Sequence, residues 1–180
     1  MKEEVQLVDE LGNVIGYEEK LKAHRLGLLH SAFSLMIVRN TKSGYEFLLQ
    51  RRALGKYHSG GLWSNTCCSH PRRGEPIQDA VRRRVNEELG IMTLSPLHAL
   101  SPFTYKAYLD NDLIEHEYDH IFISECSPDP ICPEPNEVMS FEWMKEQQIL
   151  QLLDTEPKRF TAWFADVFKY VRAYLLGFKS

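Results

Sequence analysis

Apolar positions along this chain fall into short runs separated by polar turns, a pattern that predicts a sheet. Gly12 and Asn13 separate two such runs near the N-terminus, which predicts a hairpin. Five further segments carry strand-like runs: 31–38, 45–51, 104–109, 115–124 and 140–144. Polar turns lie between the first two and between the next two. The first two are expected to pair, and the set predicts a mixed sheet.

Helical spacing is clearest near the C-terminus. Seven residues recur there at intervals of three and four: Phe160, Trp163, Phe164, Val167, Phe168, Val171 and Leu175. Such a stripe predicts an amphipathic helix. The stretches 54–63 and 127–137 have the composition of loops. We therefore expect the α+β class, an α/β/α sandwich with a mixed sheet flanked by helices, and a single domain over residues 1–180.

A second helix is predicted from Pro76 to Gly90, because proline suits a first helical turn and glycine a helix end. Its apolar stripe runs at steps of four: Ile77, Val81, Val85 and Leu89. At about 100° per residue, Glu88 projects into this stripe and Arg84 lies at its edge. A carboxylate on a buried face needs a partner. Glu88 is therefore either in a buried salt bridge with an arginine or a ligand of a cation.

The composition narrows the class of protein. Hydrophobic residues make up 43% and charged residues 26% of the 180, and the net charge of −4 argues against general nucleic-acid binding. The acidic N-terminus lacks the apolar core of a secretory signal, and no apolar run could cross a bilayer. The four cysteines form no C-x-x-C pair, so we expect reduced thiols in the cytoplasm. We expect no membrane partner, and either a monomer or a weak homodimer.

Candidate chemistry gathers in "WSNTCCSHP" (63–71) and "IEHEYDH" (114–120). A strand period of two places Glu115 and Glu117 on one face, where two carboxylates repel unless a cation or a proton separates them. Three histidines are candidates to join them: His24, His30 and His70. Three imidazoles and two carboxylates suit zinc, manganese or magnesium. The other four histidines are expected to be surface or packed residues: His58, His98, His116 and His120.

Residues 69–91 resemble the Nudix box. The positions in register are Glu75, Arg83, Val85, Glu87, Glu88, Gly90 and Ile91. The stretch departs from the box twice, with Ser69 at the opening glycine and Arg84 at a glutamate that helps hold the catalytic metal in family hydrolases. A cation at that position argues against ordinary Nudix hydrolysis.

A wider resemblance covers residues 5–163. The chain is similar to the type I isopentenyl-diphosphate isomerases, through "EEKLKAH", "LLHSAFS", "LLQRRALGK", "GLWSNTCCSHP", "FTYKA", "IEHEYDH", "NEVMSFEW" and "RFTAWF". The order W-x-N-x-x-C-x-H-P ahead of a Nudix-like helix is specific to them. The resemblance implies interconversion of isopentenyl and dimethylallyl diphosphate by a metal-assisted proton shift through a tertiary carbocation, feeding isoprenoid biosynthesis.

The resemblance also implies site residues. The metal ligands would be His24, His30, His70, Glu115 and Glu117, holding one Mn²⁺, Zn²⁺ or Mg²⁺. Glu88 and the backbone carbonyl of Cys68 would hold Mg²⁺ on the substrate diphosphate. Basic residues around that diphosphate would be Lys20, Arg52, Lys56 and Arg84. Cys68, Glu117 and Tyr105 would be catalytic. Trp163 would face the carbocation, a cation–π contact compatible with core packing.

Two other functions stay open at this point. A Nudix pyrophosphohydrolase acting on a nucleoside diphosphate derivative would share the helix and the magnesium, but would favour a carboxylate at position 84 and would not need Cys68. A non-catalytic module could use the histidines and cysteines for structural zinc, although such sites are usually closed by four Cys or His ligands. A thiol beside cations is also expected to be reactive towards alkylating agents.

Overall fold

The computed structural model describes residues 2–128 and 130–177. Its strands are β1 (Glu4–Val8), β2 (Val14–Glu19), β3 (His30–Thr41), β4 (Gly44–Arg52), β5 (Trp63–Ser64), β6 (Cys67–Ser69), β7 (His98–Ala99), β8 (Phe103–Tyr108), β9 (Ile114–Glu125) and β10 (Val138–Lys145). Its helices are α1 (Lys20–Leu26), α2 (Ile77–Leu89), α3 (Glu146–Thr155) and α4 (Phe164–Leu175), with short 3₁₀ turns at Asp110–Asp112 and Pro157–Arg159.

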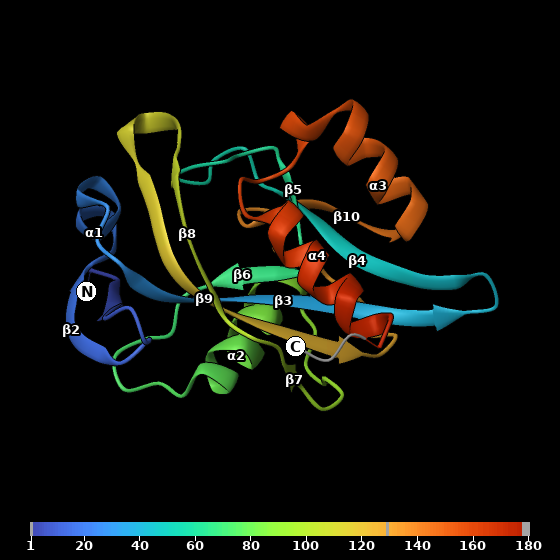
Figure 1. The fold of residues 1–180 in the computed structure, drawn as a ribbon, viewed down its shortest axis with the longest axis horizontal. Helices are drawn as coiled ribbons and strands as arrows, with labels where there is room; N and C mark the ends of the chain where they lie inside the picture. The colour runs from blue at the N-terminus through green and yellow to red at the C-terminus, as the bar shows by residue number, and fades with distance from the viewer. Residues whose placement is uncertain (1, 129, 178–180) are drawn as a thin grey trace.

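The strands form one mixed sheet with β3 at its centre (Figure 1). The main path runs β10-β4-β3-β1-β2, and its pairs are antiparallel. The long strand β9 lies parallel to β3 and carries β8 and β7 antiparallel on its other side. The short strands β5 and β6 pair with β4 and β3. The predicted mixed sheet is therefore confirmed.

Helices cover both faces of this sheet. Successive side chains along β3 point to opposite faces, so each face has an apolar surface that a helical layer buries. Phe33, Leu35 and Ile37 pack with the apolar stripe of α2. Met36 and Val38 point to the other face and pack with residues of α3 and α4. This arrangement confirms the predicted sandwich of a sheet between helical layers.

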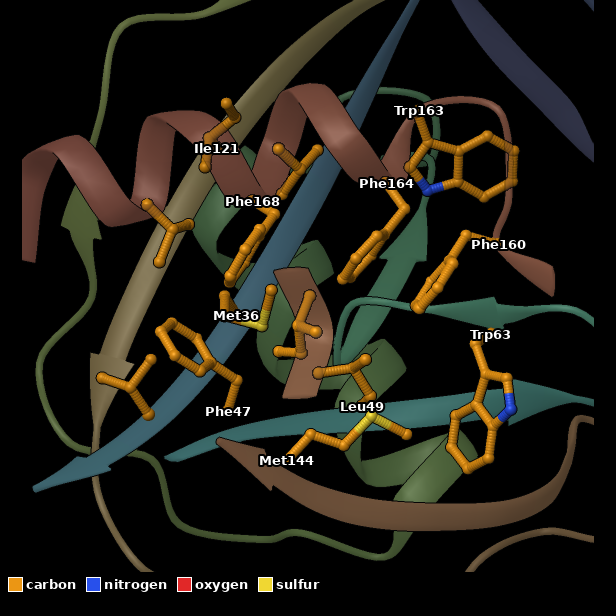
Figure 2. Close-up of a cluster of buried hydrophobic side chains, with 14 of the residues drawn as sticks. Met36, Phe47, Leu49, Trp63, Ile121, Met144, Phe160, Trp163, Phe164 and Phe168 are labelled. Atoms are coloured by element: carbon orange, nitrogen blue, oxygen red, sulfur yellow. The ribbon is translucent and has the colours of Figure 1, made fainter. Parts of the chain in front are cut away.

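Aromatic side chains dominate the core beneath α4 (Figure 2). The rings of Phe160 and Phe164 stack at 4.6 Å between centroids, and those of Phe164 and Phe168 at 5.8 Å. Trp163 lies near the Phe160 end of this row, 3% exposed (Figure 2). The row continues the core up to the edge of a polar cavity that Trp163 also lines.

Most predicted elements are confirmed, including the N-terminal hairpin and a second helix that Gly90 ends in a left-handed conformation. The C-terminal helix was predicted to begin too early. It begins only at Phe164, and Phe160 instead forms a β-bridge with Trp63. Helices α1 and α3 were not predicted. Across the described residues, no helix is long and apolar enough to cross a membrane.

Candidate active site

Strand register brings the polar candidates together at one end of the sheet. His30 on β3 is opposite Glu117 on β9, and Glu117 is opposite Tyr105 on β8. On the other side of β3, Ser34 is opposite Cys68 on β6. Residues far apart in the chain thus become neighbours because four strands share one register.

A buried group of five residues has the composition of a metal site. It comprises His24, His30, His70, Glu115 and Glu117, and one ligand atom of each lies within 4.8 Å of all the others. Donors about 2.1 Å from a six-coordinate ion lie about 4 Å apart when they are opposite each other, so the group has nearly the right size. Among the described residues, no cysteine belongs to this group.

Backbone contacts orient two of these histidines. His24 Nδ1 lies 2.7 Å from the carbonyl of Lys20, and His30 Nδ1 lies 2.8 Å from that of Leu28. A carbonyl oxygen only accepts, so each Nδ1 carries a proton, and each Nε2 has a free lone pair in the neutral ring. Both Nε2 atoms are buried without a hydrogen-bond partner, as is Glu115 Oε2. Buried nitrogen and oxygen atoms with unused lone pairs fit a divalent ion. Hydrogen bonds from the other ring nitrogen to a backbone carbonyl orient metal-binding histidines in this way in proteins.

The two carboxylates have different surroundings. Burial opposes the ionisation of Glu115, but the adjacent His24 and His58 rings outweigh it and hold the pKa of Glu115 well below its ordinary value. Glu117 accepts a hydrogen bond from the Tyr105 hydroxyl at 2.7 Å and lies 2.9 Å from His70 Nε2. Burial, and then the charge of Glu117, raise the pKa of Tyr105 well above its ordinary value. Tyr105 therefore stays a neutral donor to Glu117.

The thiol of Cys68 lies in a polar but enclosed environment. Its sulfur is 2.8 Å from Asn65 Oδ1 and 3.1 Å from Trp163 Nε1. Burial, and then the charge of Asp119, raise the pKa of Cys68 to about 12. The thiolate is disfavoured in this environment, and the reactivity of Cys68 towards alkylating agents stays a prediction. A neutral thiol is suited to act as an acid.

Asp119 is a site residue that the sequence reading missed. It is buried on the face of β9 that carries Glu115 and Glu117, and it accepts a hydrogen bond from Ser34 at 2.7 Å. Burial, and then the charge of Glu117, raise the pKa of Asp119 well above its ordinary value. The period of two that selected the two glutamates also pointed to this third carboxylate.

His58 is packed, one of the two alternatives expected for it, but it also lies beside the metal group. It lies 2% exposed in the loop before β5, with Nε2 only 2.7 Å from Glu115 Oε1. Its ring contacts those of Tyr57 and Trp163 edge-on. No periodicity marks a loop residue, so the sequence carried no signal for this position. The other three histidines lie outside the metal group.

Glu88 is buried, as its place in the helical stripe predicted. It accepts hydrogen bonds from Arg84 Nη2 at 2.5 Å and from Gln50 Nε2 at 2.7 Å, and the Cys67 thiol is 3.5 Å away. The alternative of a buried salt bridge to an arginine is therefore realised. Gln50 had no signal in the sequence reading.

Three of the four basic candidates, Lys20, Lys56 and Arg84, are held by carboxylates. Lys56 and Arg84 both contact Glu137 Oε2, the latter at 3.3 Å. Lys20 pairs with Glu3 at 3.0 Å, and burial lowers the pKa of Lys20 with help from the charges of Lys56 and Arg84.

Arg52 lines the cavity next to His58 and Trp163. Its Nη2 donates to the carbonyl of His58 at 3.1 Å, and its guanidinium lies 5.6 Å from the Trp163 ring. The structure therefore places Arg52 beside the metal group and brings Lys20, Lys56 and Arg84 close enough for their charges to interact.

A small cavity joins these parts. Its volume is about 20 Å³, and Arg52, Cys68, His70, Glu117 and Trp163 are among the residues that line it. The Cys68 thiol, the Glu117 carboxylate, the Trp163 indole and the Arg52 guanidinium therefore line the same cavity.

Comparisons with known proteins identify the family of this chain. The NUDIX domain family matches residues 28–164. An isopentenyl-diphosphate Delta-isomerase of Photobacterium profundum is 52% identical over 172 residues, covering 95% of each chain. A protein of the same description from Aliivibrio fischeri (strain MJ11) is 47% identical and covers 97% of this chain and 98% of its own.

Solved structures share the fold at low identity. A Deinococcus radiodurans protein superimposes with a TM-score of 0.73 at 19% identity, covering 93% of this chain and 99% of its own. A MutT protein from Methanosarcina mazei Go1 reaches 0.62 at 21% identity, covering 81% and 95%. The chain belongs to the NUDIX superfamily and, within it, to the family of isopentenyl-diphosphate Delta-isomerases.

Proposed function

We propose that the protein interconverts isopentenyl diphosphate and dimethylallyl diphosphate, a step that feeds isoprenoid biosynthesis. The observation that carries this proposal is the single cavity lined by both Cys68 and Glu117. An unactivated alkene is a very weak base, so moving its double bond requires one group that delivers a proton and another that removes one. A neutral thiol and a carboxylate in one enclosed space supply that pair.

The catalytic residues divide the work by position. Cys68 would act from one side of a flat substrate, and Glu117 with Tyr105 from the other. The Tyr105 hydroxyl, bonded to Glu117 at 2.7 Å, would move a proton to or from that carboxylate. The tertiary carbocation between the two steps needs electron density without a nucleophile. The indole of Trp163 at the cavity wall would offer it through its face.

The metal group fits one divalent ion, which we propose is Mn²⁺, Zn²⁺ or Mg²⁺. His24, His30, His70, Glu115 and Glu117 would hold it. When bound, the ion supplies positive charge that tunes the acidity of a ligating carboxyl. Glu117 would keep one oxygen for the ion and the other for its bond with Tyr105.

The diphosphate would be bound by Lys20, Arg52, Lys56 and Arg84. Glu137 holds two of these cations through one oxygen, so a diphosphate would compete with it for them. We propose that Mg²⁺ accompanies the diphosphate, held by Glu88 and the carbonyl of Cys68. The cavity of about 20 Å³ is the size of a single water, so its lining must part to admit a five-carbon chain.

Hydrolysis of a nucleoside diphosphate derivative is the weaker alternative. Arg84 stands where a hydrolase would place a metal-binding carboxylate, and here its guanidinium neutralises Glu88 instead. A site with a cation at this position favours holding the diphosphate intact. A structural zinc module is disfavoured because the metal group contains two carboxylates and leaves Cys68 outside.

The remaining expectations belong to the same proposal. We infer one domain over residues 1–180, a small-molecule substrate with no nucleic-acid or membrane partner, and a monomer or weak homodimer. The described cysteines are free thiols, which supports a reducing compartment such as the cytoplasm.

The decisive experiment is incubation with isopentenyl diphosphate and Mg²⁺, followed by separation of the products. We expect dimethylallyl diphosphate with no phosphate release. Phosphate release without that product would favour the hydrolase instead.

A further inference from the structure

Asn65 lies fully buried in the turn between β5 and β6, three residues before Cys68. Its Nδ2 donates to the carbonyl oxygens of Leu35 and Cys67, each at 3.1 Å. Carbonyl oxygens only accept, so these contacts decide which end of the amide is nitrogen. The other end, Oδ1, must then face the thiol of Cys68.

The two shortest contacts of the Cys68 sulfur favour one arrangement of its proton. Asn65 Oδ1, at 2.8 Å, can only accept, so the S–H donates to it. Trp163 Nε1, at 3.1 Å, can only donate, so its proton points at a sulfur lone pair. Two short contacts of opposite polarity hold the thiol in one rotamer at the cavity wall.

Neighbouring hydroxyls lie farther from the sulfur than Asn65 Oδ1 does, with Ser64 Oγ at 3.6 Å and Ser34 Oγ at 3.7 Å. Thr161 donates to Ser64 at 3.2 Å, and Ser64 donates to Asn65 Oδ1 at 3.1 Å. Ser34 donates to Asp119 at 2.7 Å and stays 3.7 Å from the sulfur. Each of these hydroxyl protons therefore has another acceptor, and the hydrogen bonds converge on Asn65 Oδ1.

We propose that Asn65 is a positioning residue, whose side-chain carbonyl accepts the S–H of Cys68 and so fixes the sulfur beside Trp163 at the cavity wall. Its effect on turnover rests on the isomerase function proposed above, because proton transfer falls steeply when donor and acceptor are misplaced. The geometry itself exists without substrate and can be measured without it.

The first test is the infrared S–H stretching band of the protein without isoprenoid substrate. A hydrogen bond to a carbonyl lowers the frequency of this band. The Cys68 band is identified as the one missing in Cys68→Ala. We expect Asn65→Leu to shift it to higher frequency, towards that of a weakly bonded thiol.

Thr66 provides the matched control. It is equally buried in the same turn, where its hydroxyl donates to Leu48 O at 2.6 Å and accepts from Ile37 N at 2.8 Å. It has no contact with Cys68 among these bonds. Thr66→Val should lower stability and leave the S–H band in place. An unshifted band in Asn65→Leu, or an equal shift in Thr66→Val, overturns the proposal.

A milder variant covers the case in which Asn65→Leu fails to fold. Ser64→Ala removes the hydroxyl that shares Asn65 Oδ1, together with the longer contact of that hydroxyl with the sulfur at 3.6 Å. The thiol then has Asn65 Oδ1 to itself, so this bond should strengthen and the S–H band move to lower frequency. No movement in that variant would count against Asn65 as the acceptor.

The second test is kinetic. We expect Asn65→Leu to lower kcat by about 10- to 100-fold with little change in KM, since the diphosphate contacts are untouched. A fall in kcat no larger than that of Thr66→Val would reduce Asn65 to a structural residue. If wild-type protein fails to isomerise while the band shifts as expected, the proposed function is wrong and the positioning stands.

Discussion

At the scale of single residues, adjacent positions in β6 have separate surroundings. Cys67 points into the core between β3 and α2, where its thiol is 3.5 Å from Glu88. Cys68 points to the opposite face, towards Trp163 and the cavity. A strand turns consecutive side chains to opposite faces, so two identical residues come to different environments.

This alternation predicts a large difference between two alanine variants. Cys68→Ala should lower kcat by about 10²- to 10⁴-fold, the usual contribution of a positioned proton-transfer group. Cys67→Ala should keep most of the activity, because it removes only a packed thiol. Steady-state isomerisation assays on both variants check this. Equal losses would contradict the assignment of Cys68.

At the scale of elements, α2 depends on how its C-terminal end is closed. Gly90 adopts φ +67, and its N–H bonds to Asn86 O at 2.8 Å. The following loop also satisfies the last carbonyls, since Cys132 N donates to Leu89 O and Glu134 N donates to Glu88 O. These bonds hold the end of the helix, where Glu88 lies, against the loop that leads to β10.

Gly74 and Gly90 have nearly the same positive φ but different surroundings, so substituting each one distinguishes backbone strain from steric crowding. A Cβ at Gly90 would lie 3.0 Å from Cys132 Cβ and O, whereas one at Gly74, with φ +69, would meet nothing within 4 Å. We expect Gly74→Ala to lower the free energy of unfolding by about 1–2 kcal/mol through the left-handed backbone alone. Gly90→Ala should cost clearly more in urea unfolding. An equal loss of unfolding free energy in the two variants would show that the loop at Cys132 moves aside without cost.

At the scale of the whole molecule, the metal group ties distant segments together. Its ligands come from α1, β3, the segment after β6, and β9. Several buried nitrogen and oxygen atoms there lack partners in the protein itself. Such groups are costly to bury, so an ion that satisfies them should stabilise the folded chain as well as tune the site.

Metal removal should therefore lower the melting temperature. An ion at a hundred times its Kd adds about 2.7 kcal/mol to the free energy of unfolding. Calorimetry with chelator and with added Mn²⁺ measures this. His24→Asn should lose the metal-dependent gain, and His98→Asn, a change at an exposed histidine on β7, should keep it. The same gain in both variants would place the stabilising ion elsewhere.

Much of the fold could be predicted because a buried strand needs apolar residues in a recognisable period. That signal placed β3, β4, β9 and α2 close to their observed bounds. It failed for α1, whose seven residues are too few to show a stripe. It also extended α4 back to Phe160, because an apolar row continues there without helical backbone.

The sequence by itself determined the family, the buried position of Glu88, and the shared face of Glu115 and Glu117, since each follows from local order and period. Only the tertiary structure decided three contacts of the site. His58 is buried against Glu115, Cys68 donates a hydrogen bond to Asn65, and Glu137 forms ion pairs with Lys56 and Arg84. These contacts join residues from separate loops and strands. No local pattern specifies the distance between such residues until the sheet register brings them together.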